Sequence, residues 1–549
     1  MHFIWARATI TVSLLINITE MCVGFLNLGG STNDGSKTQK GIKMQIINII
    51  NFVRAVEPRK NDDSFLPLTL KEELKLCARY GFPSTVLLQY DALIRPEYIE
   101  IIKKYGKNAE IGLWFEIVEP LAAACKIPWR GRFPWDWHSD VGFLVGYTPE
   151  QRIKLIDAAF EKFKEIFGYY PGVAGSWHID AFSLKYMSER YHIVASCNCK
   201  DQCGTDGYTM WGGYWNGAYY PSVNNMFCPA NTKETQINVP VFRMLGSDPV
   251  HQYDLGLGEP EKGQSVMSLE PVYGNSGADV RWVKNFLDVI FNGKGLALEY
   301  TQAGQENSFG WEKICDGLTM QFEEIKKRLA NSDIKLLTLG DAGRLFSENY
   351  ALTPACAVCA DKDTAGGDLK TVWYMSRYYR VNILYGNGDF HIRDIHLFRD
   401  GFCEKYLDST EKSPVCFFSN IPLVDGFRFS SREKTAGAYF RAAGENIAFD
   451  EDVETFAEND TVTVTVGEKL RINAAPERLI IECGVQEYTL HFSFVEKKDI
   501  SFELKSKKTL DIIYLGHRES VSLSSGSFKA VDGEFEILPE NGKIIIETV

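Results

Sequence analysis

The sequence lacks the motifs that bind nucleotides and has little positive charge. Neither a GxxxxGK phosphate loop nor a GxGxxG motif after a strand occurs in its 549 residues. The 59 Lys and Arg residues are outnumbered by 72 Asp and Glu, which gives a formal net charge of −13 at pH 7. Because nucleic acids are held largely through contacts of Lys and Arg with phosphates, this balance argues against a nucleic-acid partner. We therefore expect neither a nucleotide cofactor nor a nucleic acid.

Histidine, long apolar runs and serine nucleophile motifs are scarce as well. The chain has only nine histidines and no G-x-S-x-G element. Beyond residue 43 no run reaches 18 uninterrupted apolar residues, so we expect no membrane span. The 13 cysteines are odd in number and lie mostly in apolar segments. This pattern is typical of buried thiols in a reducing compartment, and it predicts a cytoplasmic location.

Residues 1–43 have the character of an extension. An apolar stretch, Ala8–Ile18, follows Arg7 as in a weak secretion signal, but no small-x-small cleavage site follows it. Residues 29–43 are polar and rich in Gly, Ser, Thr and Lys, a composition typical of unstructured chain. We expect a poorly structured extension or a weak leader. If the leader is genuine, a secreted or periplasmic location replaces the cytoplasmic one.

Residues 44–350 alternate between strand and helix patterns. Apolar runs of the kind that parallel sheets bury on both faces are separated by well-signalled helices, one of which begins with the capping sequence Thr148–Gln151. Repeated βαβ units predict an α/β fold with a (β/α)7-8 barrel, and an open doubly wound sheet is the alternative. The predicted strands are Gln45–Val56, Ser84–Tyr90, Ala109–Ile117, Gly172–Ile179, His192–Cys197, Ser265–Glu270, Gly295–Tyr300 and Ile334–Leu339.

Two insertions and a change of pattern interrupt this alternation. Residues 119–147 and 199–264 are long, and long loops in compact domains are usually binding loops or lids. Residues 351–549 carry short alternating segments such as Thr461–Val466 and Lys543–Glu547. These segments predict antiparallel strands, and hence one or two β-sandwich-like modules after the barrel.

Acidic residues stand at the carboxyl ends of several predicted strands. Because these ends share one face of a parallel barrel, we expect Glu57, Glu116 and Asp180 to gather at its mouth. Hydrolysis of a glycosidic bond needs two carboxyl groups, one neutral and one ionised. The pattern therefore predicts a carbohydrate-active hydrolase, and Glu270 is one further carboxylate of the late barrel. The predicted catalytic residues are Asp180, Glu116, Glu57, Glu299 and Glu306.

Structural roles compete with these assignments. Asp180 precedes a predicted helix and suits an N-cap, a common use of Asp. Glu116 lies within an apolar strand, where a buried ion pair with Arg54 or Arg130 would also explain it. Both roles stay open at the level of sequence.

Aromatic residues are concentrated in the predicted barrel and its insertions. Sugar rings stack on indole rings, and their hydroxyls hydrogen-bond to acids and amides nearby. The alternative is that about half of these tryptophans only pack in the core. The predicted substrate-binding residues are Asp91, Trp114, Trp135, Trp137, His138, Trp177, His178, Trp211 and Gln305.

Short motifs in residues 45–345 resemble those of the NodB-like polysaccharide deacetylases. Ala109–Gly112 carries an E-I-G strand, and Tyr147–Gln151 carries a T-P-E-Q helix start, in the same order as in that family. The resemblance implies kinship with the glycoside hydrolases that share the seven-stranded barrel. The family has two Asp after strand one and a His-x3-His pair after strand three, whereas Glu57 stands alone here and Trp114 and Val118 fall at the His positions. The resemblance therefore implies a bacterial branch without the usual metal triad.

In the related hydrolases the nucleophile ends strand four and the acid lies on a late strand, which implies Asp180 and either Glu299 or Glu306. We predict a glycosidase that needs no cofactor and acts on a carbohydrate substrate. Two alternatives remain: a non-catalytic carbohydrate-binding barrel, and a metal-dependent sugar deacetylase. The ligands of that second alternative would be Glu57, His138, His178 and Asp180. The sequence does not indicate the sugar, the stereochemistry or the oligomeric state.

Overall fold

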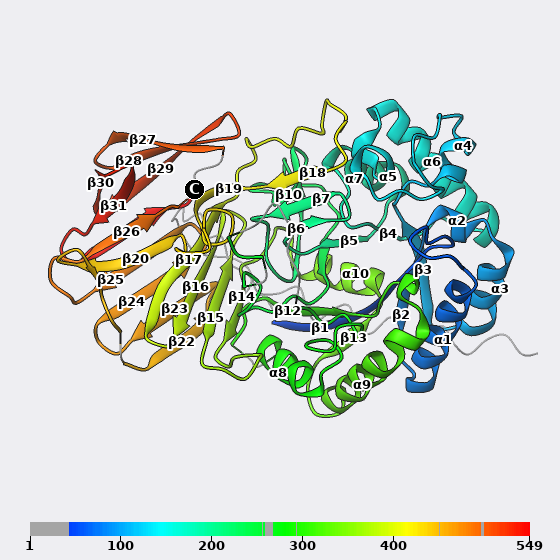
Figure 1. The fold of residues 1–549 in the computed structure, drawn as a ribbon, viewed down its shortest axis with the longest axis horizontal. Coiled ribbons are helices and arrows are strands. Elements are labelled where there is room, and N and C mark those ends of the chain that lie inside the picture. Colours follow the sequence, from blue (N-terminus) through cyan, green and yellow to red (C-terminus); the bar gives the residue numbers. More distant parts are fainter. Residues whose placement is uncertain (1–42, 255, 259–266, 292–293, 450, 496–498) are drawn as a thin grey trace, which may run out of the picture. The chain divides into compact units, whose positions relative to one another are not determined.

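Seven parallel strands form the central sheet of the N-terminal half (Figure 1). The computed structural model describes residues 43–254, 256–258, 267–291, 294–449, 451–495 and 499–549, so the predicted extension lies outside it apart from Lys43. The strands pair in the order β12 (Leu298–Ala303), β1 (Met44–Val53), β2 (Ser84–Leu88), β3 (Ala109–Trp114), β4 (Val173–Gly175), β5 (Ala195–Cys199) and β11 (Val241–Met244).

The sheet curls until its two edge strands approach each other. The Leu245 N–H, just after β11, donates to Gln302 Oε1 in β12 at 2.9 Å, which links the ends of the ladder. Two short strands are added: β13 (Lys335–Leu337) pairs parallel with β1, and β8 (Ala218–Tyr219) pairs antiparallel with β11. The predicted (β/α) barrel is therefore confirmed.

Helices follow the strands and cover the sheet. The predicted capping of α6 is confirmed, because the Thr148 side chain accepts from the Gln151 N–H while the Gln151 side chain accepts from the Thr148 N–H. The longer helices are α1 (Phe65–Tyr80), α3 (Pro96–Tyr105), α6 (Pro149–Phe167), α7 (Ala181–Tyr191), α8 (Val280–Ile290), α9 (Trp311–Leu329) and α10 (Leu339–Asn349). Short helical segments are α2 (Tyr90–Leu93), α4 (Glu119–Ala124), α5 (Ser139–Gly142), η1 (Leu144–Gly146) and η3 (Asn307–Phe309).

One predicted strand is wrong, and one barrel strand was not predicted. Residues 267–270 of the predicted strand Ser265–Glu270 form only an isolated bridge, between Ser268 and Ser247, while residues 265 and 266 lie outside the described chain. The missing strand is β11, inside the insertion that we expected to be a loop. Its run of four residues contains Arg243, which is fully buried because Asp201 and Asn198 accept hydrogen bonds from its guanidinium.

The C-terminal half is all β, as predicted, and lies to the left in Figure 1. Apolar side chains of its two large antiparallel sheets form a second hydrophobic core. The first sheet contains β14 (Cys356–Ala360), β15 (Lys370–Met375), β16 (Tyr379–Gly386), β17 (Asp389–Leu397), β19 (Ile421–Asp425), β20 (Gly437–Ala442), β21 (Glu445–Asn446), β26 (Thr489–Ser493), β30 (Ser527–Val531) and β31 (Glu534–Leu538). The second contains β22 (Val453–Glu458), β23 (Thr461–Val466), β24 (Leu470–Ala475), β25 (Arg478–Cys483), β27 (Ile500–Ser506), β28 (Thr509–Tyr514), β29 (His517–Ser525) and β32 (Lys543–Glu547).

One strand of the C-terminal half pairs with an insertion of the barrel. Strand β18 (Cys416–Ser419) runs parallel to β7 (Tyr208–Trp211), which forms a hairpin with β6 (Gln202–Thr205). The insertion also contains the small ladder of β9 (Pro221–Ser222) and β10 (Asn225–Pro229). The insertion 199–264 is therefore structured chain over much of its length, which corrects the loop prediction.

Within the described residues, every helix is either too short or not apolar enough to cross a lipid bilayer.

Candidate active site

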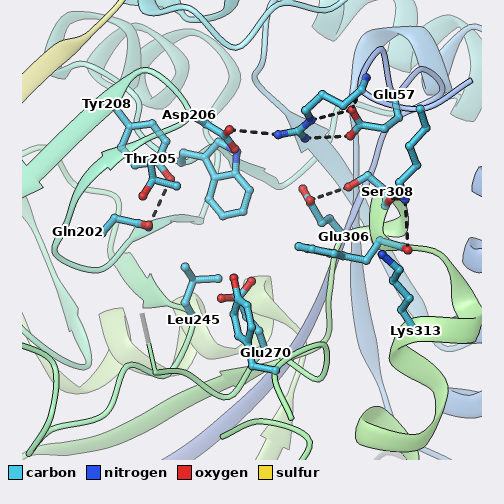
Figure 2. Close-up of a pocket in the computed structure, with 15 residues that line it drawn as sticks. Glu57, Gln202, Thr205, Asp206, Tyr208, Leu245, Glu270, Glu306, Ser308 and Lys313 are labelled. Atoms are coloured by element: carbon cyan, nitrogen blue, oxygen red, sulfur yellow. Dashed lines mark hydrogen bonds and ion pairs between the residues drawn. The ribbon is translucent and has the colours of Figure 1, made fainter. Parts of the chain in front are cut away.

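A cavity of about 430 Å³ lies at the carboxyl ends of the barrel strands (Figure 2). Its walls come from the segments that follow β1, β4, β11 and β12, from the β6–β7 hairpin and from the start of α9. Four of its lining residues are acidic: Glu57, Asp206, Glu270 and Glu306. This is the face of a parallel barrel on which active sites are built, because loops from many strands converge there.

Arg54 gathers three carboxylates beside this cavity. Its Nη1 lies 3.4 Å from Glu57 Oε2, and its Nη2 lies 3.3 Å from Glu116 Oε2 and 2.9 Å from Glu306 Oε2. The guanidinium is buried and stacks on the Trp135 ring at 4.0 Å. Burial alone would lower the pKa of Arg54, but the three carboxylates raise it, so this side chain stays charged.

Glu57 is held by two guanidinium groups. Arg59 Nε donates to its Oε1 at 2.8 Å and Arg59 Nη2 to its Oε2 at 2.9 Å, in addition to the contact with Arg54. Although burial opposes ionisation, the hydrogen bonds from Arg59 and the charge of Arg54 lower the pKa of Glu57. Glu57 is therefore an ionised carboxylate whose two oxygens are both engaged.

Glu116 is buried behind the cavity and accepts four hydrogen bonds. Besides Arg54, the donors are the Trp114 indole at 2.9 Å, Gln89 Nε2 at 2.9 Å and, on its other oxygen, the Trp177 indole at 2.9 Å. Burial raises the pKa of Glu116 to about 7, despite the charge of Arg54. Glu116 does not line the cavity; it holds the Trp177 ring, which does. The ion pair of Glu116 with Arg54 is one of the two structural explanations that the sequence allowed for this buried glutamate.

Glu270 is the one cavity carboxyl group for which the described chain provides no ion pair. Its Oε2 accepts from the Ser268 hydroxyl at 2.8 Å, and its Oε1 accepts from Gln305 Nε2 at 3.2 Å. Burial raises the pKa of Glu270 to about 7, and the nearby charges of Glu306 and Asp206 act in the same direction. A carboxyl group in this state is half protonated near neutral pH and can donate a proton.

Glu306 approaches the cavity from the end of β12. Its Oε2 pairs with Arg54, and its Oε1 accepts from the Ser308 hydroxyl at 2.6 Å. Figure 2 shows Glu270 and Glu306 entering the same space from different walls. The site thus combines Glu270, which has no cation partner among the described residues, with three carboxylates that have guanidinium partners.

The remaining wall is aromatic and polar. The rings of Trp177 and Tyr208 are nearly parallel, with centroids 6.5 Å apart, and both line the cavity. Asp206 projects from the tip of the β6–β7 hairpin and pairs with Arg59 at 3.2 Å. The tip is the dipeptide Asp206-Gly207, in which both residues have positive φ, as the tightest hairpin turns require. Such a wall offers a stacking surface beside hydrogen-bonding groups.

Besides Glu116, three further predicted acids lie outside the cavity. Asp180 is fully buried, caps α7 by accepting from the Ser183 N–H at 3.0 Å, and pairs with Arg152 at 3.0 Å. Glu299 lies near the opposite end of the barrel, where Lys43, Gln45 and the Gly295 N–H contact it. Asp91 accepts from the N–H groups of Ala55 and Ala92, and burial raises its pKa to about 6.

The predicted binding residues divide between the site and the core. Trp177 lines the cavity, while Gln305 is buried and orients Glu270. Trp135 and Trp137 lie against the guanidinium of Arg59, with ring centroids 5.0 and 5.4 Å away.

The other predicted aromatic and histidine residues lie away from the cavity. Trp211 is a core residue packed on Phe427. His178 stacks on Phe143 at 4.4 Å, and its burial lowers its pKa to about 3. His138 precedes α5 and does not line the cavity.

The donor set of the site does not fit a divalent metal ion. The described residues contain no group of three or more His, Cys, Asp or Glu side chains able to hold one. No histidine lines the cavity, and Glu57 and Glu306 have guanidinium partners where a cation would bind. The hypothetical ligands Glu57, His138, His178 and Asp180 are not brought together, since Asp180 pairs with Arg152 and His178 lies between aromatic rings.

Arg54, Asp206 and Glu270 are central to the site but were not in the predicted set of catalytic and binding residues, although Glu270 was noted as a further carboxylate of the late barrel. The Asp-Gly pair at 206–207 is a strong hairpin signal that would have located Asp206. Arg54 was considered only as a partner of Glu116. Glu270 ended a predicted strand, Ser265–Glu270, but in the structure it follows an isolated bridge in an irregular segment.

Comparisons with known proteins bear on the fold. No protein-family model matches the sequence, and no curated protein matches it. Among solved structures, a candidate glycoside hydrolase/deacetylase from Parabacteroides distasonis is similar, with a TM-score of 0.50, 18% identity, and coverage of 69% of this chain and 90% of that chain. A candidate polysaccharide deacetylase from Mycobacterium smegmatis has a TM-score of 0.37, 13% identity, and coverage of 56% and 91%. The first likeness confirms the fold that the resemblance implied, and the second is too distant to add to it.

Proposed function

We propose that this protein is a carbohydrate-active hydrolase that cleaves a glycosidic bond in the cavity at the barrel mouth. The observation that supports this most is the contrast between Glu270, which has raised pKa and no ion pair among the described residues, and Glu306, which pairs with Arg54 in the same cavity. Two carboxyl groups in opposite states are what glycoside hydrolysis needs.

In the proposed reaction, Glu270 is the general acid. It transfers its proton to the glycosidic oxygen as the bond from that oxygen to the anomeric carbon breaks. Water supplies the hydroxyl group that ends on the anomeric carbon, and the proton of that water returns the site to its starting state. Glu306 is the ionised partner, which either stabilises positive charge at the anomeric carbon or attacks it. Glu57 is less suited to attack, because Arg59 and Arg54 engage both of its oxygens.

The surrounding groups have positioning roles in this proposal. Arg54 orients Glu306, Gln305 orients Glu270, and Glu116 fixes the Trp177 ring on which a sugar would stack. The tyrosine and acid of the hairpin wall, Tyr208 and Asp206, would hydrogen-bond to sugar hydroxyls. The metal-dependent deacetylase alternative gains no support from this donor set.

Glycosides with leaving groups of different acidity test the role of Glu270. We expect Glu270→Gln to reduce kcat/KM by about 10²–10⁴-fold on alkyl glycosides, which need protonation of the leaving oxygen, and much less on dinitrophenyl glycosides, which do not. Glu312→Gln, an exposed acid on α9, is the matched control. An equal loss on both kinds of substrate would reject Glu270 as the acid, and sugar binding without any turnover of wild-type protein would favour the non-catalytic alternative.

A further inference from the structure

The cationic groups of the cavity are not all neutralised. Arg59 is paired with Glu57 and Asp206. Lys60 and Lys313 line the same cavity, yet within the described chain neither of them forms an ion pair with a carboxylate. The acids nearby are committed to guanidinium groups or, in Glu270, carry a raised pKa. One side of the cavity therefore presents two ammonium groups that form no ion pair with any described carboxylate.

Lys60 is held at the rim by neutral groups. Its Nζ donates to the carbonyl oxygens of Ser308 and, at 3.3 Å, Phe309, and lies 4.3 Å from the centroid of the Phe65 ring. Partial burial lowers the pKa of Lys60, and the positive charge of Lys313 lowers it further. The carboxylates of Glu57 and Glu306 act on the pKa of Lys60 in the opposite direction.

Lys313 has no folding role that accounts for its charge. It lies in the first turn of α9, where the helix dipole disfavours a cation, and its side chain is exposed. Figure 2 shows it extending toward Ser308 and Glu306, on the side of the cavity opposite the hairpin wall of Thr205, Asp206 and Tyr208. Like charges placed together cost stability unless an anion lies between them.

We infer that the substrate is an anionic carbohydrate, with a carboxylate or sulfate group bound between Lys60 and Lys313 while the sugar ring stacks near Trp177. This inference rests on the proposed function, since it assigns the substrate of the same cavity. An acidic sugar supplies a counter-charge for the two lysines. Because Arg54 and Arg59 already pair with Glu306 and Glu57, those carboxylates repel its anionic group less. A neutral sugar would leave both ammonium groups unpaired.

The test compares sugars that differ only in charge. We would measure kcat/KM for a uronic-acid oligosaccharide, its carboxyl-reduced neutral counterpart and a sulfated form of that neutral sugar. Wild-type protein should prefer one or both charged forms, and Lys60→Gln and Lys313→Gln should each lower that preference by about tenfold. The preference should also fall with added salt. Lys327→Gln, on the same helix but outside the cavity, is the control and should retain the preference.

Calorimetric binding of the same three sugars to Glu270→Gln separates this inference from the proposed function. If wild-type protein cleaves none of the sugars, but the charged forms bind Glu270→Gln more tightly and adding Lys313→Gln abolishes the difference, the anionic site stands and the hydrolase proposal fails. If the neutral sugar is cleaved as well as the charged ones, the inference is overturned and the hydrolase proposal stands. Failure of all three sugars to bind also overturns the inference.

Discussion

The two ends of strand β12 each carry a buried glutamate, in opposite settings. At its start, Glu299 is 1% exposed and is contacted by Lys43, Gln45 and a backbone N–H. Just past its end, Glu306 shares Arg54 with two other carboxylates and faces the cavity. The same residue type is therefore used for structure at one end of the barrel and exposed to ligand at the other. Both glutamates are buried, so burial does not distinguish the two roles. The end of β12 at which each glutamate lies does distinguish them.

Replacing each of these two glutamates by glutamine should give the largest contrast between their roles. We expect Glu306→Gln to lower kcat/KM by about 10²–10⁴-fold with little change in the free energy of unfolding. Glu299→Gln should instead cost about 1–3 kcal/mol of stability, because it weakens a buried hydrogen-bond set. Glycoside kinetics and urea unfolding of both variants measure this, and equal kinetic losses would contradict the assignment.

Removing the guanidinium of Arg54, which contacts three carboxylates at the barrel mouth, should lower the free energy of unfolding. Arg54→Met leaves Glu116 and Glu306 without their guanidinium and should cost about 3–5 kcal/mol, because buried charge loses its partner. Arg152→Met breaks a buried ion pair with Asp180 and serves as the comparison. Urea unfolding gives the stability of each variant. If Arg54→Met were as stable as wild type, the carboxylate cluster would not depend on this ion pair.

A substitution of Asp180 tests whether this carboxylate caps a helix or takes part in catalysis. Asp180→Asn keeps a side-chain oxygen for the Ser183 N–H but weakens the ion pair with Arg152. We expect a loss of about 1–3 kcal/mol in unfolding free energy and a change in kcat/KM of less than about tenfold. Abolished turnover in a variant that unfolds like wild type would restore Asp180 to the catalytic residues.

The mildest perturbation of the site is a change of pH. Because the pKa of Glu270 is raised to about 7, its protonated form decreases as pH rises through that value, so kcat/KM should fall about tenfold per pH unit above it. The same shift means that the folded state binds the proton more tightly than the unfolded state, so this contribution to stability is present below pH 4.5 and is lost as pH rises through about 7. The alkaline decline in rate should be missing from Glu270→Gln; its persistence there would point to another group.

The sequence was sufficient for the barrel but not for the site. Strands such as β1 and β2 were predictable because apolar runs are buried on both faces of a parallel sheet. Strand β11 was not, because its Arg243 is a charged residue whose burial depends on hydrogen bonds to Asp201 and Asn198, 42 and 45 residues earlier in the chain. Strand ends indicated that Glu57 and Glu306 belong to the mouth. Which carboxyl group lacks a cation depends on contacts such as Gln305 with Glu270, which no local pattern encodes.

The pairing of β18 with β7 ties the N-terminal half to the C-terminal half. Residues 416–419 are the outer support of the hairpin that carries Asp206 and Tyr208 to the cavity. A shortened protein that stops after α10 would keep all seven parallel strands yet leave β7 with an open edge. The C-terminal half therefore supplies part of the support for the cavity wall, and a chain cut after α10 should keep the barrel but lose the order of the hairpin wall.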